Sequence, residues 1–441
     1  MQNIAYKITG GEKVSGKVTC MGAKNFATKA MIACLLSREI STLNNVPRIG
    51  DVEITQKLLE SAGALISWNS HNSSITIDPA PLQESKVALP DSRTNRMPIL
   101  LLSVLLHRFG TATVPTVGGD DIGKRNVDFH IDAIQKFGAD VKKEGNVYAA
   151  EVRNKLKGCH ITLPYPSVGA TETCLFLATL AEGTSVIKNI AIEPEIIALI
   201  TMLRAMGAII FLDSVRCLTV HGVQELDGTN IYVIGDRIEA ASWASLACAS
   251  GGEIEVSGVK PDQLGNFLSY YNQVGGGYKL IDADTIKFYR RHELKHVIIE
   301  TDVYPGFSTD WQQPFSVLLT QANGMSVIHE TVYEQRFGYL EVLNKLGAKT
   351  QVVKACLGSL PCRYKGFDYE HGALIYGPTT LKAIPEPIAV PDIRGGLAYL
   401  IAAALAEGTT ILTVAEQIER GYGDLIKKLK DVNLRIEKIR V

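Results

Sequence analysis

The feature of this sequence that most constrains its fold is a unit that occurs six times along the chain. In each copy an apolar helix is followed by a short anchor of small or acidic residues, then a β-branched strand, a loop and a second helix. Several of the second helices end at a Gly-Ala pair, and glycine is the residue expected just beyond a helix. Counted from positions 40, 110, 183, 251, 324 and 408, successive copies lie 70, 73, 68, 73 and 84 residues apart. The anchors are Glu39-Ile40-Ser41-Thr42, Phe109-Gly110-Thr111, Glu182-Gly183-Thr184, Gly251-Gly252-Glu253, Asn323-Gly324-Met325 and Glu407-Gly408-Thr409.

A period of this length exceeds the roughly 20–50 residues of common solenoid repeats and predicts that each copy is a complete α/β unit. In the third copy, residues 171–181 are apolar enough for a buried helix, whereas residues 184–187 are β-branched and favour a strand. Six such units can form either an open array or two closed groups of three. The periodicity leaves both arrangements open.

Composition excludes several classes of protein. The 45 Lys and Arg residues nearly balance the 46 Asp and Glu residues, which argues against a basic nucleic-acid-binding surface. Eight cysteines without a Cys-x-x-Cys pair predict free buried thiols rather than a zinc ribbon. The amino terminus lacks a signal-peptide pattern, and the longest apolar runs, 97–106 and 397–405, are shorter than the roughly 20 residues that span a bilayer. We therefore expect a cytoplasmic globular protein of two or three domains, without a nucleic-acid or membrane partner.

Several of the first helices begin with charged residues. Lys24, Arg96 and Arg394 stand at three of these starts. Helix N-termini present unpaired N–H groups and the positive end of the helix dipole, so equivalent helices packed side by side would attract an anion. Asp310 and Asp392 stand at two starts as well, and each is interpreted either as a ligand contact or as an N-cap.

The loop 117–130 combines three glycines with the adjacent acids Asp120 and Asp121 and the adjacent cations Lys124 and Arg125. Such a loop can act as a lid that covers an anionic substrate and presents an acid, with a solvated turn as the alternative. It approaches the P-loop pattern but has Arg125 where a magnesium-binding Ser or Thr would stand. We therefore do not expect a nucleoside-triphosphate hydrolase.

Seven motifs occur in order along nearly the whole chain. They are Gly22-Ala23-Lys24-Asn25, Gly118-Gly119-Asp120-Asp121-Ile122-Gly123 with Arg125 and Val127-Asp128, Ser167-Val168-Gly169-Ala170-Thr171, Phe307-Ser308-Thr309-Asp310, Glu334-Gln335-Arg336-Phe337, Asp392-Ile393-Arg394, and Arg420-Gly421-Tyr422. Jointly they resemble the UDP-N-acetylglucosamine 1-carboxyvinyltransferases, also called UDP-N-acetylglucosamine enolpyruvyl transferases, of the EPSP synthase superfamily. The resemblance implies an α/β fold of two inside-out barrel domains, each of three repeated units, with the active site between them. One domain is expected at 22–233 with the Asp120 loop, and the second at 1–21 plus 234–441.

The resemblance implies an enzyme that transfers enolpyruvate from phosphoenolpyruvate to the 3-hydroxyl of UDP-N-acetylglucosamine and releases phosphate. This is the first committed step of peptidoglycan precursor synthesis, on which the cell wall, cell shape and cell division depend. Neither a metal nor an organic cofactor is implied, and the oligomeric state is left open. The alternatives are the same transfer to another nucleotide or to shikimate 3-phosphate, and a non-catalytic paralogue that binds UDP-sugars.

Roles for individual residues follow from the same resemblance. Lys24, Arg125 and Arg420 would bind the phosphate and carboxylate of phosphoenolpyruvate, because guanidinium forks donate paired hydrogen bonds to both anions. Asp120 would act as the general acid, and Asp310 would assist the attacking 3-hydroxyl as a base. Further substrate contacts are implied for Asn25, Arg96, Arg125, Asn126, Val127, Asp128, Phe129, Ser167, Val168, Gly169, Val332, Arg336, Asp392 and Arg394.

The main departure from the family is Asp120, because the family commonly has a cysteine there as the proton donor to C3 of phosphoenolpyruvate. A carboxylic acid can donate this proton if burial raises its pKa, although nearby arginines act in the opposite direction. Fosfomycin alkylates the cysteine thiolate, and a carboxylate is a much poorer nucleophile, so the chain is predicted to be insensitive to it. Tyr165 replaces a frequent lysine and Asn126 the usual proline, which leaves a related nucleotide acceptor open.

Two further histidine patterns are interpreted as structural. The segment 292–296 matches the zinc-protease pattern HExxH, which requires a helix to bring both imidazoles to one face. The β-branched run 297–301 that follows predicts a strand instead, so we expect no zinc site there. His130, which follows the 117–130 loop, is interpreted as a packing or surface residue rather than a group that polarises a substrate.

Overall fold

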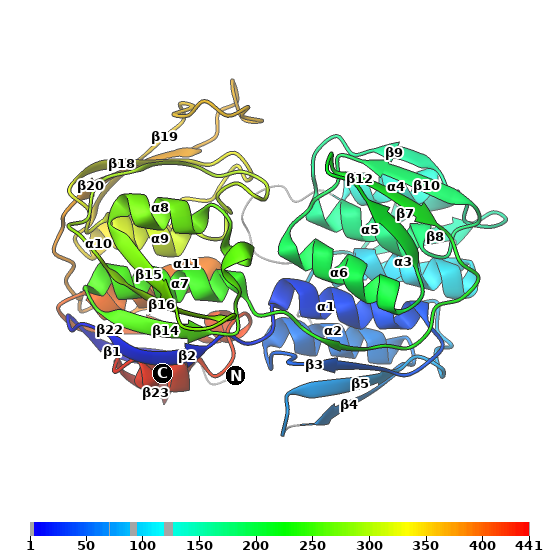
Figure 1. Ribbon diagram of the computed structural model, residues 1–441, viewed down its shortest axis with the longest axis horizontal. Helices are drawn as coiled ribbons and strands as arrows, with labels where there is room; N and C mark the ends of the chain where they lie inside the picture. The colour runs from blue at the N-terminus through cyan, green and yellow to red at the C-terminus, as the bar shows by residue number, and fades with distance from the viewer. Residues whose placement is uncertain (1–3, 70, 89–94, 119–126, 441) are drawn as a thin grey trace. The chain divides into compact units, whose positions relative to one another are not determined.

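The computed structural model describes residues 4–69, 71–88, 95–118 and 127–440, and this part of the chain divides into two compact units (Figure 1). Unit N comprises residues 22–118 and 127–234 and contains the first three copies of the repeat. Unit C comprises residues 235–440 together with residues 4–21 and contains the last three copies. Each unit has its own buried hydrophobic core.

The helices of unit N form its interior. The first helices of the three copies contact one another in succession, and nearly all residues of the second and third of them are buried. The predicted apolar helix at 171–181 corresponds to the third of these. The helices are α1 (Lys24–Ala33), η1 (Cys34–Leu36), α2 (Gly50–Ser61), α3 (Met97–Phe109), α4 (Asp128–Lys136), α5 (Val168–Ala178) and α6 (Pro194–Ala205).

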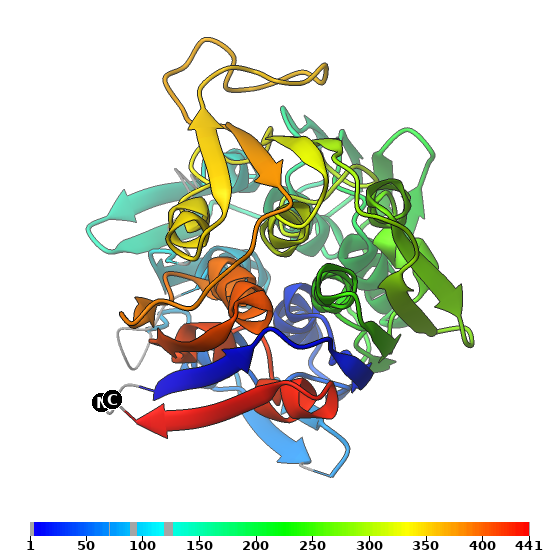
Figure 2. The same cartoon turned by 90° about the vertical axis from the view of Figure 1, so that its left-hand side faces the viewer.

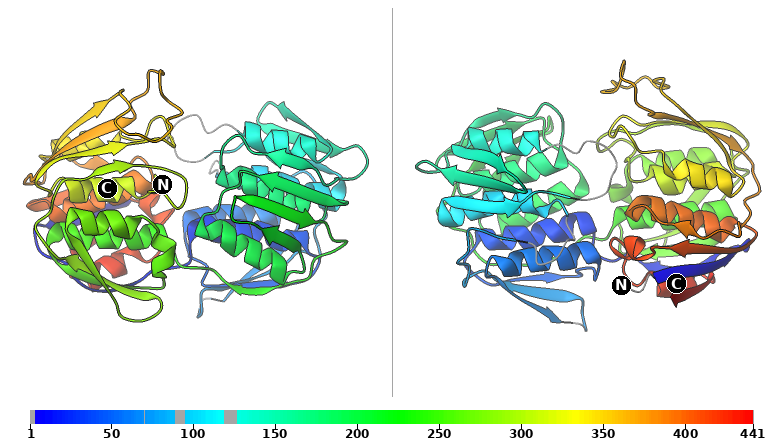
Figure 3. Two further views of the ribbon diagram at one scale, coloured as in Figure 1. Left: turned by 45° about the horizontal axis from the view of Figure 1, so that its top comes forward. Right: turned by 180° about the vertical axis from the view of Figure 1, so that it is seen from behind.

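Three sheets cover these helices on the outside of unit N (Figure 3). Each sheet contains the strand that follows one anchor, paired antiparallel with a later strand of the same copy. In spatial order the sheets are β13 (Asn230–Tyr232), β3 (Ser41–Asn44), β5 (Ser74–Asp78) and β4 (Leu65–Asn69); β6 (Thr111–Pro115), β8 (Val147–Val152) and β7 (Ala139–Glu144); and β11 (Ile209–Leu212), β12 (Cys217–His221), β10 (Thr184–Lys188) and β9 (His160–Thr162).

Unit C repeats this plan, and Figure 2 shows its helices inside a surround of strands. The helices are α7 (Arg237–Ser250), η2 (Pro261–Leu264), α8 (Phe267–Val274), α9 (Gln312–Leu319), α10 (Tyr339–Lys345), α11 (Ile393–Leu405), α12 (Glu416–Glu419) and α13 (Leu425–Asp431). The sheets are β15 (Gly276–Leu280), β16 (Thr285–Arg290), β14 (Glu253–Ser257) and β2 (Ser15–Thr19); β17 (Ile298–Glu300), β18 (Gly324–His329), β20 (Gly372–Gly377) and β19 (Lys349–Val353); and β21 (Ile388–Ala389), β22 (Gly408–Thr413), β1 (Ile4–Gly10) and β23 (Arg435–Arg440).

Strand pairing between distant copies closes each group of three. In unit N, β13 at the end of the third copy pairs in parallel with β3 of the first, with Asn230 opposite Thr42. In unit C the amino-terminal segment closes the group, because β1 joins the sheet of the sixth copy and β2 joins the sheet of the fourth. Of the two arrangements that the periodicity left open, the structure therefore has two closed triplets, and the predicted inside-out α/β fold is confirmed.

The repeated anchor has a backbone reason. Gly110, Gly183, Gly251, Gly324 and Gly408 all have φ between 70° and 103°, a region that residues with a Cβ rarely adopt. This conformation turns the chain from the end of each buried helix into the next strand, so five of the six anchors require glycine.

Two expectations about other segments can be compared directly with the structure. The HExxH segment 292–296 is not helical and lies between β16 and β17, as the β-branched run predicted. Within the described residues, no helix combines the length and apolar character needed to cross a bilayer.

Candidate functional site

The start of α1 in unit N places Lys24 beside an acid from the second helix of the same copy. The Nζ atom of Lys24 lies 2.9 Å from Oδ2 of Asp51, and the two side chains are 16% and 9% exposed. An ammonium at a helix N-terminus adds to the positive potential of the helix dipole. Lys24 thus provides a partly accessible cation, and Asn25 next to it is half-buried.

The start of α3 is built by two consecutive residues. The buried Asn95 accepts a hydrogen bond from the backbone N–H of Met97 through Oδ1, and its side-chain amide donates to the backbone oxygen of Asp51. Arg96 is the N-cap residue of α3. Asn95 thus links the start of α2 to the start of α3. The backbone of Arg96 is therefore fixed near Asp51, the ion-pair partner of Lys24.

His130 brings two predicted binding segments together. It lies on α4, directly after Val127, Asp128 and Phe129, and its Nδ1 atom is 2.7 Å from Oγ1 of Thr173 on α5. Its ring packs so closely on Gly169 that a Cβ there would approach the ring to 2.8 Å. The segments 127–129 and 167–169 are therefore neighbours, as a shared ligand requires.

The environment of His130 confirms its interpretation as a packing residue. Only 5% of the residue is exposed, and burial, with a smaller effect from the charge of Arg96, lowers its pKa to about 3. A neutral imidazole in this place supports the backbone around Gly169 and does not supply a proton near neutral pH.

The sequence analysis did not identify a buried ionic pair beside this region. Lys29 on α1 and Glu172 on α5 lie 4.0 Å apart, with side chains that are 12% and 3% exposed. Burial raises the pKa of the Glu172 carboxyl, and the charge of Lys29 opposes that rise. The signal was a single acid within the apolar run that begins at residue 170, since buried acids are rare without a partner.

In unit C the principal polar cluster is centred on Asp310. Oδ1 of Asp310 accepts a hydrogen bond from Arg336 at 2.5 Å, and Oδ2 accepts one from Nε of Arg394 at 3.2 Å. The two arginine side chains are 3% and 6% exposed, whereas that of Asp310 is 24% exposed. Three predicted site residues thus form one cluster, and the carboxylate is its most accessible member.

Arg394 is held by more than Asp310. Its guanidinium also donates a hydrogen bond to the hydroxyl of Tyr422, a buried residue two positions after Arg420. Burial alone would lower the pKa of Arg394, but Tyr422 and Asp310 raise it above its ordinary value. The guanidinium therefore stays charged, while that of Arg420 is bound to Oε1 of Gln417 at 3.0 Å.

Glu330 organises the segment around Val332. Its buried carboxylate accepts hydrogen bonds from the backbone N–H groups of Val332 and Tyr333 at 2.7 and 3.0 Å, and from Oγ1 of Thr309 at 2.8 Å. Thr309 directly precedes Asp310, so one carboxylate connects the Val332 turn to the Asp310 cluster. The sequence analysis named Val332 and missed Glu330, because a single acid at the end of a strand has no distinctive spacing.

Of the two acids that had alternative interpretations, Asp392 adopts the capping role. Its Oδ1 atom accepts hydrogen bonds from the backbone N–H groups of Arg394 and Gly395, both at 2.9 Å. Asp310, in contrast, is not the N-cap of α9, which is Trp311. In unit N, Ser167 caps α5 through a 3.3 Å hydrogen bond from the N–H of Ala170.

Three predicted residues, Asp120, Arg125 and Asn126, lie outside the described residues. Their roles stay predictions, as do the ligand contacts assigned to the other site residues. What the described geometry provides is a helix end with an ammonium group in unit N and two buried guanidinium groups on either side of Asp310 in unit C. Each is suited to phosphate or carboxylate groups, because such groups bind at helix N-termini and to guanidinium forks.

Comparison with known proteins relates this chain to a single group. The family model described as EPSP synthase (3-phosphoshikimate 1-carboxyvinyltransferase) matches residues 8–429. The UDP-N-acetylglucosamine 1-carboxyvinyltransferase of Protochlamydia amoebophila is 43% identical, over 98% of this chain and 94% of that protein. The corresponding protein of Chlamydia abortus is 42% identical, over 98% of this chain and 97% of that protein.

Solved structures show the same fold. The enolpyruvyl transferase NikO from Streptomyces tendae superposes with a TM-score of 0.86 at 20% identity and covers 100% of both chains. An EPSP synthase from Acinetobacter baumannii superposes with a TM-score of 0.72 at 17% identity, over 99% of this chain and 100% of that one.

Proposed function

The chain belongs to the EPSP synthase family, and from this premise we propose that it is a UDP-N-acetylglucosamine 1-carboxyvinyltransferase. It transfers the enolpyruvyl group of phosphoenolpyruvate to the 3-hydroxyl of UDP-N-acetylglucosamine and releases inorganic phosphate. The observation that carries this assignment is 41–43% identity to curated enzymes of that name over 98% of the chain. The reaction supplies a peptidoglycan precursor and takes place in the cytoplasm.

We assign the donor anion to the cationic side chains. Lys24, Arg125 and Arg420 bind the phosphate and carboxylate of phosphoenolpyruvate, and Arg96 and Arg394 add positive potential. Fixed charges of this kind stabilise the leaving phosphate without reorganising during the reaction. The partly exposed Lys24 supports this assignment, because its single described ion pair with Asp51 leaves N–H donors for a ligand.

The chemistry begins with proton transfer from Asp120 to C3 of phosphoenolpyruvate, which develops positive charge at C2. The 3-hydroxyl oxygen of the sugar then bonds to C2 as Asp310 accepts its proton, giving a tetrahedral ketal. Asp120, now a carboxylate, takes a proton back from C3 as the bond between C2 and the phosphate oxygen breaks, which restores the double bond and releases phosphate. The proton on Asp310 is released to solvent. The exposure of Asp310 supports this role, because its carboxylate is the most accessible group of the cluster.

The acceptor is assigned to the two neighbouring segments of unit N and to the turn of unit C. The stretch Arg125–Phe129, which includes Asn126, and Ser167–Gly169 hold the uracil and the diphosphate. Asn25 contacts the sugar nucleotide, and Val332, Arg336 and Asp392 complete the substrate contacts. The proximity of the first two segments through His130 supports this assignment. One domain of the proposed enzyme comprises residues 22–233, and the other comprises residues 1–21 together with 234–441.

The decisive experiment measures phosphate release from phosphoenolpyruvate with UDP-N-acetylglucosamine, shikimate 3-phosphate and other UDP-sugars as acceptors. We expect turnover with UDP-N-acetylglucosamine and none with shikimate 3-phosphate. Asp120→Asn should lose activity while retaining sugar-nucleotide binding. Binding of the nucleotide by the unmodified protein without any turnover would establish the non-catalytic paralogue instead.

Fosfomycin tests the acid at position 120 separately. The unmodified enzyme should keep its activity after prolonged incubation with fosfomycin, because a carboxylate is a poor nucleophile toward the epoxide. Asp120→Cys should become inactivated in a time-dependent manner. Time-dependent inactivation of the unmodified enzyme would contradict the assignment of Asp120.

A further inference from the structure

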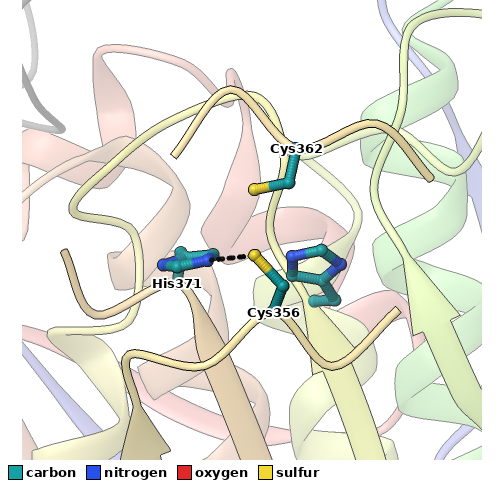
Figure 4. Close-up of side chains that lie close together, drawn as sticks. Cys356, Cys362 and His371 are labelled. Atoms are coloured by element: carbon teal, nitrogen blue, oxygen red, sulfur yellow. Dashed lines mark hydrogen bonds between the residues drawn. The ribbon is translucent and has the colours of Figure 1, made fainter. Parts of the chain in front are cut away.

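Four potential metal ligands converge at one end of the sheet β17-β18-β20-β19 of unit C. His329 is the last residue of β18 and His371 directly precedes β20, while Cys356 and Cys362 lie in the connection between β19 and β20. The ligand atoms of all four side chains lie within 4.8 Å of one another. Figure 4 shows Cys356, Cys362 and His371 directed toward a common point.

Strand register accounts for half of the cluster. β18 and β20 pair antiparallel with His329 opposite Gly372, so His371 is one residue from the position across the strand. The two rings have centroids 5.5 Å apart. The connection between β19 and β20 then returns over this end of the sheet and supplies both cysteines.

The distances fit a tetrahedral ion. Zinc bonds of about 2.3 Å to sulfur and about 2.0–2.1 Å to nitrogen give a tetrahedron whose edges are roughly 3.3–3.8 Å. Sγ of Cys356 lies 3.3 Å from Nε2 of His371. The remaining separations lie within 4.8 Å, so each exceeds a tetrahedral edge by at most about 1.5 Å.

Both histidines are oriented as metal ligands. Nδ1 of His371 donates a hydrogen bond to the backbone oxygen of Tyr369 at 2.7 Å, so the lone pair is on Nε2, which faces Cys356. Nδ1 of His329 lies 3.5 Å from Oε2 of Glu300. Carbonyl or carboxylate partners on the second ring nitrogen are typical of zinc-bound histidines, because they fix the tautomer and the ring.

An unsatisfied nitrogen is the second, independent sign of a ligand. Nε2 of His329 is fully buried and has no hydrogen-bond partner among the described residues. A buried polar atom without a partner destabilises the folded state, because it has lost its hydrogen bonds to water and gained none in return. An ion coordinated by this nitrogen would satisfy it.

The cysteines are suited to the same ion. Sγ of Cys362 accepts a hydrogen bond from the backbone N–H of Tyr364 at 3.4 Å, which fixes the position of the sulfur in the cluster. Cys356 and Cys362 are half-buried, whereas the histidines are 0–1% exposed, so an ion can enter from the cysteine side. Two thiolates and two imidazoles in a tetrahedron favour zinc among the common divalent ions.

We propose that His329, Cys356, Cys362 and His371 form a structural Zn²⁺ site that fixes the connection between β19 and β20. Four protein ligands fill the coordination sphere, so the ion has no open position for a substrate. The sequence analysis expected no metal site and did not consider these four residues together. A Cys-x5-Cys pair with histidines 27 residues before and 9 residues after it matches no compact zinc motif.

The ion would also stabilise the turn at Val332, an inference that rests on the proposed function. Arg363 and Tyr364 follow Cys362 in the connection, and both donate hydrogen bonds to the backbone oxygen of Val332, at 2.5 and 2.6 Å. Glu330 holds the N–H of the same residue. Loss of zinc should therefore release one side of the turn assigned to the sugar nucleotide.

The test uses the untagged full-length protein expressed with zinc supplementation and purified under reducing conditions. Elemental analysis should find one zinc per chain, and a cobalt-substituted sample should show the visible bands of a tetrahedral ion with thiolate ligands. Cys356→Ser with Cys362→Ser should lose the metal and unfold at a lower temperature than the zinc-loaded chain. The matched control Cys217→Ser, a half-buried thiol of unit N, should retain one zinc.

Three results would overturn the site. These are less than one-tenth of a zinc per chain in the supplemented wild-type protein, a Cys356–Cys362 disulfide in that protein, or equal zinc content in the double variant and the control. Titration of wild-type protein with Zn²⁺ against a chelator needs no variant, so it decides whether the site binds zinc even if the double variant does not fold.

Kinetics separates the two inferences. The metal-free wild-type enzyme should show a KM for UDP-N-acetylglucosamine raised several-fold, with a smaller change in kcat. If the protein binds zinc but the metal-free and zinc-loaded enzymes have the same KM, the link to Val332 is wrong and the zinc site stands. Bound zinc with no turnover on any acceptor would instead contradict the proposed function.

Discussion

Both units place a cationic residue at the start of a first helix, Lys24 on α1 and Arg394 on α11, but hold it differently. In unit N, Lys24 is 16% exposed and its described ion pair is to a single carboxylate, Asp51. In unit C, Arg336 and Arg394 are 3% and 6% exposed and share the carboxylate of Asp310, and Arg394 also binds Tyr422. Unit C therefore presents a preorganised cluster, whereas the cation of unit N can exchange its one carboxylate partner for a ligand.

This difference decides where a mutation should be most damaging. Removing Asp310 takes away the carboxylate that two buried guanidinium groups share, and breaking a buried ion pair is strongly destabilising. Removing the more exposed cation of unit N, Lys24, takes one cation away from one buried acid, Asp51. We expect larger effects in unit C.

The largest effect is expected for Asp310→Asn. The amide keeps the size of the side chain but cannot accept the proton of the sugar hydroxyl, so kcat should fall about 10²- to 10⁴-fold. Steady-state phosphate release measures the loss, with Asp140→Asn, an exposed acid of unit N, as control. A kcat within threefold of wild type would remove Asp310 from the chemistry.

Exchange of lysine and arginine tests whether the two units hold their cations differently. Arg394→Lys should lower kcat/KM by about 10²-fold, because an ammonium cannot reproduce the simultaneous contacts to Asp310 and Tyr422. Lys24→Arg should cost less than about tenfold, since a single contact to Asp51 can be made by either side chain. Comparable losses in the two variants would show that the units hold their cations equally.

The stability of the protein toward acid should depend on His130 of unit N. The pKa of its buried imidazole is about 3, below the ordinary value of 6.5, so the unfolded chain takes up a proton first as the pH falls. The neutral buried imidazole contributes fully to the free energy of unfolding above pH 6.5, and this contribution is lost as the pH falls toward 3. The loss between pH 7 and pH 5 is about 2 kcal/mol.

Chemical denaturation at pH 7 and pH 5 measures this contribution. His130→Asn should reduce the loss of stability between the two pH values, while the exposed His71→Asn should not. An unchanged pH dependence in His130→Asn would mean that the buried imidazole does not control acid stability.

The smallest effects are expected at two helix caps. Asp392 accepts two backbone N–H groups of α11, whereas Ser167 accepts one of α5 at a longer distance. Asp392→Ala should therefore destabilise unit C by about 1–2 kcal/mol and Ser167→Ala should destabilise unit N by about 0.5 kcal/mol. Thermal unfolding ranks the two caps, and the reverse order would contradict the capping geometry.

Much of the fold was predictable because its helices, strands and turns depend on local sequence patterns. The buried helix α5 and the strand β10 follow from an apolar run and a β-branched run, and the anchor glycines mark the turns between them. The role of Asp310 was expected from the motif that carries it. Its arginine partners were named in the sequence analysis, but their convergence on one carboxylate was not.

The amino-acid sequence by itself determined the sixfold repeat, the helices and strands within each copy, and the family to which the motifs belong. Tertiary structure decided that the copies close in threes, that Asp310 meets arginines 26 and 84 residues away, and that two cysteines meet two histidines. The physical reason is the separation along the chain of the residues that determine each feature. Helices, strands and turns depend on neighbouring residues, whereas a shared carboxylate or a four-ligand cluster depends on strand register and helix packing between segments far apart in the chain.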